Sequence, residues 1–302
     1  MCTAISQNGY FGRTLDLEGS RGEEAVIMPR RFPVRFLREA DMAQHPAIIG
    51  CALVNEGVPL WFDAVNEYGL AAAGLNFPEY STYLEPKADK INLASFELIP
   101  FVLSKCRSLR EAEELLKHCN ITPDSVSPAL PATPLHWMIA DREGCIAVEP
   151  TAGGLIVYNN PFGVLTNSPP FPVHRDNAML HPKMTPSSAS GLPGDWSSES
   201  RFLRALFAKK YTAGGGVNDY FHIMDTVAVP NGCSKKDWHT VYTSSADLER
   251  GDYYFMTYED RRIRKVSLAD AELDSDELFR FSMRGEEDLE ILSRCVDKTQ
   301  QM

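Results

Sequence analysis

A cysteine occupies the second position of the chain, directly after Met1. Cysteine is small enough for routine enzymatic removal of an initiator methionine, which would leave Cys2 with both a thiol and a primary amine. A free thiol has a pKa of about 8.5 and an α-amino group one of about 7.7–8.0, so the neutral amine can act as the base for its own side chain. Nucleophile and general base would then sit on one residue, a variant of the pairing used by other covalent hydrolases.

Two charged residues follow one hairpin later, Arg13 and Asp16 in the segment GRTLD. If the second strand returns antiparallel to the first, Arg13 can support the Cys2 thiolate, and Asp16 can hydrogen-bond the amine and orient it. Residues three apart point to opposite faces of a regular strand, so we expect a bend near Thr14–Leu15. The alternative is that both are ordinary exposed strand charges, which their spacing does not reject.

The elements that must position these residues are mostly strands, separated by short polar or Gly-containing turns. Strands are predicted in three groups: 2–7, 10–15, 24–29, 47–54, 60–65 and 70–75; then an antiparallel meander at 135–141, 145–150 and 155–160; then 240–247, 252–260 and 263–270. Helices are predicted at 92–105 with a bend at Pro100, at 108–119 behind the capping box Ser108–Glu111, at 200–210, and at 217–227.

This order of strands and helices differs from the regular strand–helix alternation of a parallel sheet. It favours an α+β fold in which antiparallel sheets are covered by helices. We expect one domain spanning 1–302. The segment His181–Ser200 is rich in Pro, Ser and Gly and is predicted to be an exposed loop within that domain, and the last six residues a frayed tail.

The composition of the 302 residues is that of an ordinary globular protein, with 44% hydrophobic and 24% charged residues. No apolar run is long enough for a membrane span, and no secretory signal is visible, so we expect a cytoplasmic protein or one supplied in mature form. A net charge of −11 argues against nucleic acid or an anionic membrane as partner.

The seven cysteines form no C-x-x-C pair and no metal-binding cluster, so we expect neither a metal nor a cofactor. The six other than Cys2 are predicted to be reduced and mostly buried. A thiol-redox role for Cys2 is an alternative, which the lack of a resolving cysteine near it in sequence weakens.

Five blocks of the sequence resemble the choloylglycine hydrolase family, which contains bile salt hydrolases and penicillin V acylases. The blocks span roughly the whole chain in the family's order: MCTA with YFGRTLD, NEYGLAAAGLNFP (66–78), NLASFELIPFVL (92–103), PFGVLTNSPPF (161–171) and LPGDWSSESRFLRA (192–205). The resemblance implies an N-terminal nucleophile (Ntn) hydrolase with an αββα sandwich. It assigns Cys2 as nucleophile and base with Arg13 and Asp16 beside it, Asn76 and Asn167 to the oxyanion hole, and Arg201 as a second active-site arginine.

These roles are chemically reasonable for an amide hydrolase. Attack on an amide builds negative charge on the carbonyl oxygen, and neutral N–H donors aimed at it lower the barrier; losing one costs about 10²–10³ in rate. Without the resemblance, Asn76 and Asn167 would be interpreted as turn or strand-end residues. Arg201 would be a solvated residue at a helix start, where the helix dipole disfavours a cation.

The resemblance implies a small amphipathic amide as substrate, either a glycine- or taurine-conjugated bile salt or penicillin V. Asn76 within GLNFP favours bile salts, because penicillin-selective members often carry tyrosine there. Loops expected to line an acyl pocket supply apolar residues that suit a steroid, each of which can equally be plain core: Leu15, Leu17, Leu60, Trp61, Phe62, Leu130 and Leu135. Long-chain acyl-homoserine lactones are a further candidate.

The sequence departs from the family's bile salt hydrolases between its last two motifs. The excursion from Pro170 to Ser200, which contributes to tetramer packing in relatives, looks shortened, so we expect a homo-oligomer that is either a dimer or a tetramer. The hairpin between Cys2 and Arg13 also looks short. An alternative from another class is a catalytically silent protein that keeps the fold and binds an amphipathic ligand.

Overall fold

The chain begins with two antiparallel strands, β1 (Cys2–Gln7) and β2 (Tyr10–Leu17). The turn Asn8–Gly9 joins them with φ angles of 50° and 80°, the left-handed pair that a two-residue hairpin requires and that Asn-Gly tolerates best. Cys2 lies opposite Leu15 in the ladder. The expected antiparallel return of the second strand is therefore confirmed.

The computed structural model describes residues 1–180, 185–234 and 237–285. Within these ranges, the sheet that carries the first hairpin has the order β12 (Val164–Leu165), β1, β2, β13 (His239–Asp247), β14 (Asp252–Thr257) and β15 (Arg264–Ser267). Every strand pair in it is antiparallel.

A second, larger antiparallel sheet is stacked on the first. In the described part of the chain its order is β11 (Gly154–Asn159), β10 (Cys145–Thr151), β9 (Leu135–Ala140), β6 (Ala71–Asn76), β5 (Val58–Asn66), β4 (Ile48–Asn55), β3 (Glu24–Met28) and β16 (Phe279–Ser282). A short parallel pair, β7 (Ile91–Ala94) with β8 (Cys119–Thr122), lies beside it.

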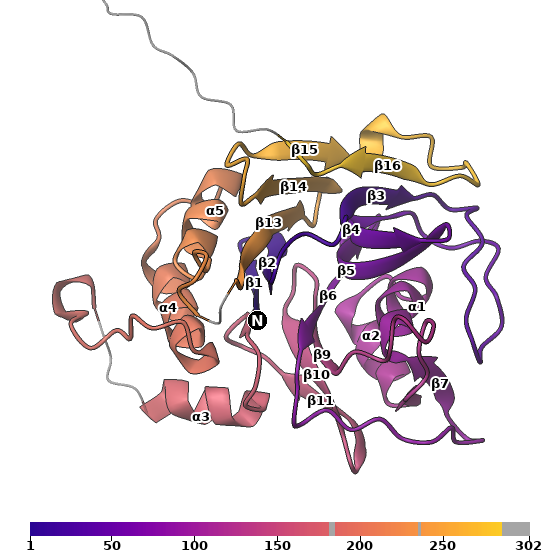
Figure 1. Ribbon diagram of the computed structural model, residues 1–302, viewed down its shortest axis with the longest axis horizontal. Helices are drawn as coiled ribbons and strands as arrows, with labels where there is room; N and C mark the ends of the chain where they lie inside the picture. Colours follow the sequence, from indigo (N-terminus) through magenta and orange to yellow (C-terminus); the bar gives the residue numbers. More distant parts are fainter. Residues whose placement is uncertain (181–184, 235–236, 286–302) are drawn as a thin grey trace, which may run out of the picture.

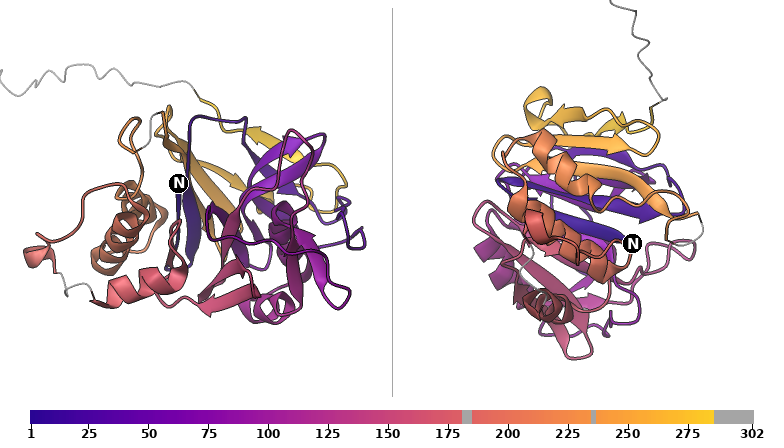
Figure 2. Two further views of the ribbon diagram at one scale, coloured as in Figure 1. Left: turned by 60° about the horizontal axis from the view of Figure 1, so that its bottom comes forward. Right: turned by 90° about the vertical axis from the view of Figure 1, so that its left-hand side faces the viewer.

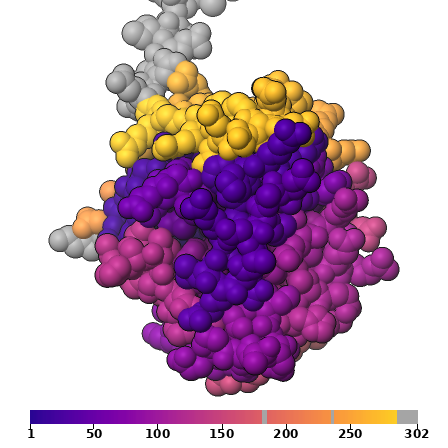
Figure 3. Space-filling view, turned by 90° about the vertical axis from the view of Figure 1, so that its right-hand side faces the viewer, coloured from indigo at the N-terminus to yellow at the C-terminus, as the bar shows by residue number. Residues whose placement is uncertain are grey.

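Helices cover the outer face of each sheet, which gives the four layers αββα (Figures 1 and 2). The first sheet is covered by α3 (Phe171–Leu180), α4 (Ser198–Tyr211) and α5 (Val217–Asp225), and the second by α1 (Leu98–Lys105) and α2 (Leu109–Leu116). The face in Figure 3 is formed mainly by the first hundred residues, with the C-terminal strands along its upper edge. The predicted α+β sandwich of two antiparallel sheets is confirmed.

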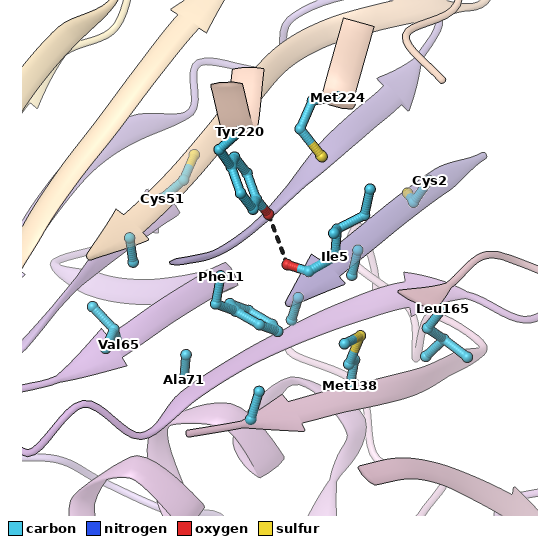
Figure 4. Packing of buried hydrophobic residues seen from close by; sticks show 14 of the residues in the cluster. Cys2, Ile5, Phe11, Cys51, Val65, Ala71, Met138, Leu165, Tyr220 and Met224 are labelled. Carbon is cyan, nitrogen blue, oxygen red and sulfur yellow. Dashed lines mark hydrogen bonds between the residues drawn. The ribbon is translucent and has the colours of Figure 1, made fainter. Parts of the chain in front are cut away.

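Two apolar clusters hold these layers together. One joins the facing sides of the two sheets and extends to α4 and α5; the other packs the outer face of the larger sheet against α1 and α2. Figure 4 shows part of the first cluster, where the Tyr220 hydroxyl of α5 donates a 2.7 Å hydrogen bond to the Ile5 carbonyl. Cys2 lies in this cluster, on the same strand as Ile5 (Figure 4).

Gly12 marks a close approach between β2 and β13. A Cβ atom at this position would overlap the main chain of Ser244 and Ser245, which cannot move aside without breaking the ladder. We expect Gly12→Ala to lower the free energy of unfolding in urea by about 3 kcal/mol, the scale of severe overpacking. Gly19→Ala is the control, because its Cβ meets nothing within 4 Å. Equal urea midpoints for the two variants would contradict this account.

The helix predicted at 92–105 is wrong in its first half. Ile91–Ala94 is strand β7, a 3₁₀ turn follows at Ser95–Glu97, and α1 begins at Leu98. This segment is a strand because it pairs in parallel with β8, which lies far along the chain. Pro100 lies in the first helical turn, where a missing N–H costs nothing.

The other helix predictions need smaller changes. The cap at Ser108 is confirmed, with Glu111 N–H donating to Ser108 Oγ at 3.3 Å. α4 begins at Ser198 rather than Ser200, so the last residues of the predicted loop are helical. The rest of that loop contains a short 3₁₀ turn within residues 185–197, and residues 181–184 lie outside the described residues. The predicted tail also lies outside them. Sequence analysis missed α3, β7, β8, β12 and β16.

None of the helices in the described ranges combines the length and apolarity that crossing a membrane requires.

Candidate active site

The Cys2 main chain is held by residues from distant parts of the sequence. Its N–H donates to Asn167 Oδ1 at 2.6 Å, and its carbonyl accepts from Arg201 Nη1 at 2.6 Å. The residue is 4% exposed. The first residue of β1 is thus fixed at both its nitrogen and its carbonyl.

Met1 extends the β1–β2 ladder by one pair. Its amino group donates to the Asp16 carbonyl at 3.0 Å, and the Asp16 N–H donates back to the Met1 carbonyl at 3.0 Å. Burial lowers the pKa of this amino group, with the nearby Cys2 and Asp16 opposing the shift. Met1 therefore covers Cys2, and removal of Met1 would expose the Cys2 nitrogen.

Asp16 is fully buried at the end of β2. Its Oδ1 accepts from the Thr240 hydroxyl at 2.6 Å, while Oδ2 has no hydrogen-bond partner among the described residues. β2 is continuous through Thr14–Leu15, where we expected a bend, and the ladder has its irregularity at this level: an extra residue of β13 between Thr240 and Tyr242, opposite Asp16 and Leu15. The partner strand absorbs the irregularity, as a β-bulge does.

Arg13 is fully buried and reaches from β2 across to the larger sheet. Its Nη1 donates to the carbonyls of Phe62 and Gly74, the two residues just beyond the Asp63–Ala73 pair at the end of the β5–β6 ladder. Its Nη2 has no partner within the described ranges. Burial opposes the charge, but neighbouring ionisable groups, Cys2 first among them, raise the pKa of Arg13. The guanidinium therefore stays charged beside the thiol.

Arg201 lies in the first turn of α4 and is also fully buried. Besides the Cys2 carbonyl it donates to Thr3 Oγ1 at 2.6 Å and to Asn167 Oδ1 at 2.9 Å. Burial lowers its pKa, an effect that Asp16 and Cys2 oppose. These oxygen acceptors explain how a cation is tolerated at a helix start.

The two asparagines contact each other. Asn167 Nδ2 donates to the Asn76 carbonyl at 2.7 Å. Asn76 is the last residue of β6 and is half-buried, and its side-chain amide has no hydrogen-bond partner in the described part of the chain. That amide is therefore available to a bound molecule.

Asp63 is a buried carboxylate near Arg13 that sequence analysis missed. Its oxygens accept from the hydroxyls of Tyr242, Ser244 and Tyr253, the last at 2.7 Å. Burial raises its pKa, and Arg13 opposes this shift. The sequence does contain a signal that could have identified Asp63, because it is the one acidic residue in the apolar segment LWFDAV.

The seven predicted pocket residues fall on both sides of the larger sheet. Leu15, Leu17 and Phe62 contact the cluster that contains Cys2; Trp61 and Leu135 pack in the cluster with α1 and α2; Leu60 and Leu130 are half-buried. Phe62 is the bulged residue of β5, facing no partner in β4. Of the seven, Leu15 lies opposite Cys2 in the ladder, and Leu17 and Phe62 share its apolar cluster.

Three of the other thiols are too basic to ionise at neutral pH. Burial raises the pKa of Cys106 and Cys119 to about 12 and that of Cys145 to about 11, so they stay protonated at neutral pH. Cys51, Cys106, Cys119 and Cys145 are free and buried, as expected for most of the set; Cys233 is exposed, and Cys295 lies outside the described residues. Among the residues described, no group of three or more His, Cys, Asp or Glu is arranged to hold a metal ion.

Comparisons with known proteins agree with this geometry. The model of the family described as linear amide C–N hydrolases, choloylglycine hydrolase family, matches residues 2–281. A bile salt hydrolase/transferase of Lactiplantibacillus plantarum is 39% identical over 95% of this chain and 98% of its own. The C2A mutant of the conjugated bile acid hydrolase from Clostridium perfringens superposes with a TM-score of 0.90, at 31% identity over 97% of this chain and 100% of its own. A penicillin V acylase from Agrobacterium tumefaciens shares the fold, with a TM-score of 0.79 at 19% identity over 95% of this chain and 93% of its own.

Proposed function

The chain belongs to the choloylglycine hydrolase family of linear amide C–N hydrolases, and from that premise we propose that it hydrolyses glycine- or taurine-conjugated bile salts through Cys2. The observation that carries the proposal is the convergence on Cys2: Asn167 at its nitrogen, Arg201 at its carbonyl, and Asp16 beside the residue that precedes it. The names of relatives 31–39% identical support bile salts as substrates.

In the proposed mechanism, removal of Met1 converts the Cys2 nitrogen into a free α-amine. This amine takes the thiol proton, and the thiolate forms a C–S bond to the amide carbon. The amine then gives the proton to the leaving nitrogen as the C–N bond breaks, which releases glycine or taurine. Water, deprotonated by the same amine, attacks the thioester; as the C–S bond breaks, the amine returns this proton to the Cys2 sulfur and the bile acid leaves.

The surrounding residues receive the following roles in this mechanism. Arg13 and Arg201 stabilise the thiolate, and Asp16 orients the α-amine. Asn167 Oδ1 accepts a hydrogen bond from the amine, while its Nδ2 has a second hydrogen to donate. We assign that donor and the free amide of Asn76 to the oxyanion. No metal or cofactor takes part.

For the acyl group, we propose a pocket near the thiol formed by Leu15, Leu17 and Phe62, which share its apolar cluster. Penicillin V, or an N-acyl-homoserine lactone, is the alternative substrate for the same chemistry. The acylase at 19% identity shows the shared fold and does not distinguish between these substrates. A silent ligand-binding protein is the remaining alternative.

Parallel turnover of glycocholate, taurocholate and penicillin V tests the substrate. We expect kcat/KM for at least one bile salt to exceed that for penicillin V by about tenfold, a difference of about 1.4 kcal/mol in transition-state binding. Asn76→Tyr is the matched variant and should shift the ratio toward penicillin V. Rapid penicillin V cleavage with negligible bile salt turnover would overturn the substrate assignment, and no turnover of any amide would favour the silent binder.

We also propose that residues 1–302 act as one cytoplasmic domain that associates as a dimer or tetramer. Three apolar side chains on α3 support self-association: Val173 is 43% exposed, Met179 72% and Leu180 84%.

A further inference from the structure

Two buried histidines hold the main chain of the segment that carries Asn167. His136 Nε2 lies 2.7 Å from the Thr166 carbonyl, and His174 Nε2 lies 2.9 Å from the Asn167 carbonyl. Because a carbonyl only accepts, each of these ring nitrogens carries the hydrogen. The peptide units on both sides of the Asn167 Cα are therefore fixed by imidazole donors.

His136 also contacts the strand that ends at Asn76. It lies in β9 opposite Leu75 of β6, one position before Asn76. Its ring stacks on Phe77, one position after Asn76, with ring centroids 4.2 Å apart and planes within 2°. One side chain thus contacts both segments that present the proposed oxyanion donors.

The other nitrogen of His136 faces a buried carboxylate. Nδ1 lies 3.3 Å from Glu149 Oε1, and that oxygen also accepts from the Phe171 N–H at 2.8 Å. His136 and Glu149 are 0% and 1% exposed. Because Nε2 already carries a hydrogen, this contact is made by a second hydrogen shared between Nδ1 and Oε1, and the pair holds the orientation of the ring.

His174 is a second support with a different environment. Its ring stacks on Phe202 at 4.9 Å, its Nε2 also lies 3.3 Å from Thr166 Oγ1, and its Nδ1 is buried with no partner among the described residues. Burial lowers its pKa, so the ring is neutral at pH 7. Unlike His136, His174 has described contacts with the Asn167 segment and none with the Asn76 segment.

We propose that His136 is a positioning residue that sets the separation between the amide donors of Asn76 and Asn167. The inference rests on the proposed function, because it takes the two amides as the oxyanion hole. Donors must be held within about 0.5 Å of the productive position, and a misplacement of about 1 Å costs about 10² in rate. A side chain that touches both segments provides this constraint.

Two variants of similar polarity separate positioning from folding. In His136→Gln, the terminal amide N–H occupies nearly the place of Nε2 and can still donate to the Thr166 carbonyl. In His136→Asn, the shorter amide stays near Glu149 and does not reach Thr166. His45→Asn is the matched control: His45 is 7% exposed, and its ring nitrogens also contact main-chain carbonyls, those of Pro46 and Phe32.

The readouts are kcat, normalised to the number of reactive Cys2 thiols, and KM, both measured on the amide that the parent cleaves fastest. The thermal midpoint of each variant is measured as well. We expect His136→Asn to lose about 10² in kcat with KM changed less than about threefold, and His136→Gln to recover at least tenfold of that loss. His45→Asn should lose stability and keep its kcat.

Three results would overturn the proposal: equal kcat for the two His136 variants, a kcat loss in His45→Asn as large as in His136→Asn, or a folded His136→Gln variant that has lost 10² in kcat. If His136→Asn does not fold, His136→Gln against the parent decides, with a loss of at most tenfold expected. A parent that cleaves penicillin V alone refutes the bile salt proposal and leaves the histidine test intact.

Discussion

Cys2→Ala is expected to fold normally and to lose amide hydrolysis by at least about 10⁴-fold in kcat, since removing a catalytic nucleophile costs about 10⁶ in a well-studied hydrolase. The buried thiols described elsewhere in the chain stay protonated at neutral pH and do not substitute for it. The thiols of Cys106, Cys119 and Cys145 have pKa values of about 11–12, and none of them contacts Arg201 or Asn167 in the described structure. Release of glycine or taurine measures the loss.

Two further variants test this result: Cys2→Ser is the conservative replacement of the nucleophile, and Cys233→Ala is the control. Cys2→Ser keeps the α-amine and a hydroxyl, a much weaker nucleophile, so we expect less than about 1% of parent activity. Cys233→Ala removes an exposed thiol and should leave turnover unchanged. Intact mass after rapid mixing with substrate should show a transient acyl adduct on the parent and none on Cys2→Ala. Parent-like turnover by Cys2→Ala would remove the thioester step.

Local sequence signals were sufficient for the hairpins. Asn8–Gly9 between two alternating strands predicts the β1–β2 turn, and the meander from Leu135 to Asn159 follows from short breaks between apolar runs. Asn92–Ala94 was misassigned because its strand state depends on pairing with residues nearly thirty positions away. A propensity argument does not contain that partner.

The site residues likewise fall into those placed by local pairing and those placed by tertiary packing. The hairpin brings Cys2 beside Leu15 by local pairing, whereas Asn167 and Arg201 reach Cys2 across 165 and 199 residues, so they were identified through family motifs rather than spacing. Their actual contacts, with the nitrogen and carbonyl of Cys2, depend on tertiary packing that no motif specifies. Asp63 and His136 left a weaker signal, a single polar residue inside an otherwise apolar strand.

Retention of Met1 should be nearly as damaging as loss of the thiol. With Met1 present, the Cys2 nitrogen is an amide that cannot accept the thiol proton, and general base catalysis contributes about 10²–10⁴ in rate. Met1 also pairs with Asp16 on both of its main-chain groups and leaves Cys2 4% exposed, which blocks approach of the substrate. We therefore expect chains that keep a residue before Cys2 to have less than about 1% of the activity of the processed form.

A cleavable leader placed directly before Cys2 turns this expectation into a switch. The uncleaved fusion should be inactive, and proteolysis that leaves Cys2 first should restore full turnover; a second fusion whose cleavage leaves Met1 in place controls for leader removal itself. Burial lowers the pKa of the amine at the Met1 position, and comparable burial of the Cys2 amine would favour its neutral form, which is the form that acts as a base. Intact mass assigns each form. A Met1-bearing product that matches the Cys2-first product in kcat would show that the α-amine is not the base, even if Cys2 remains the nucleophile.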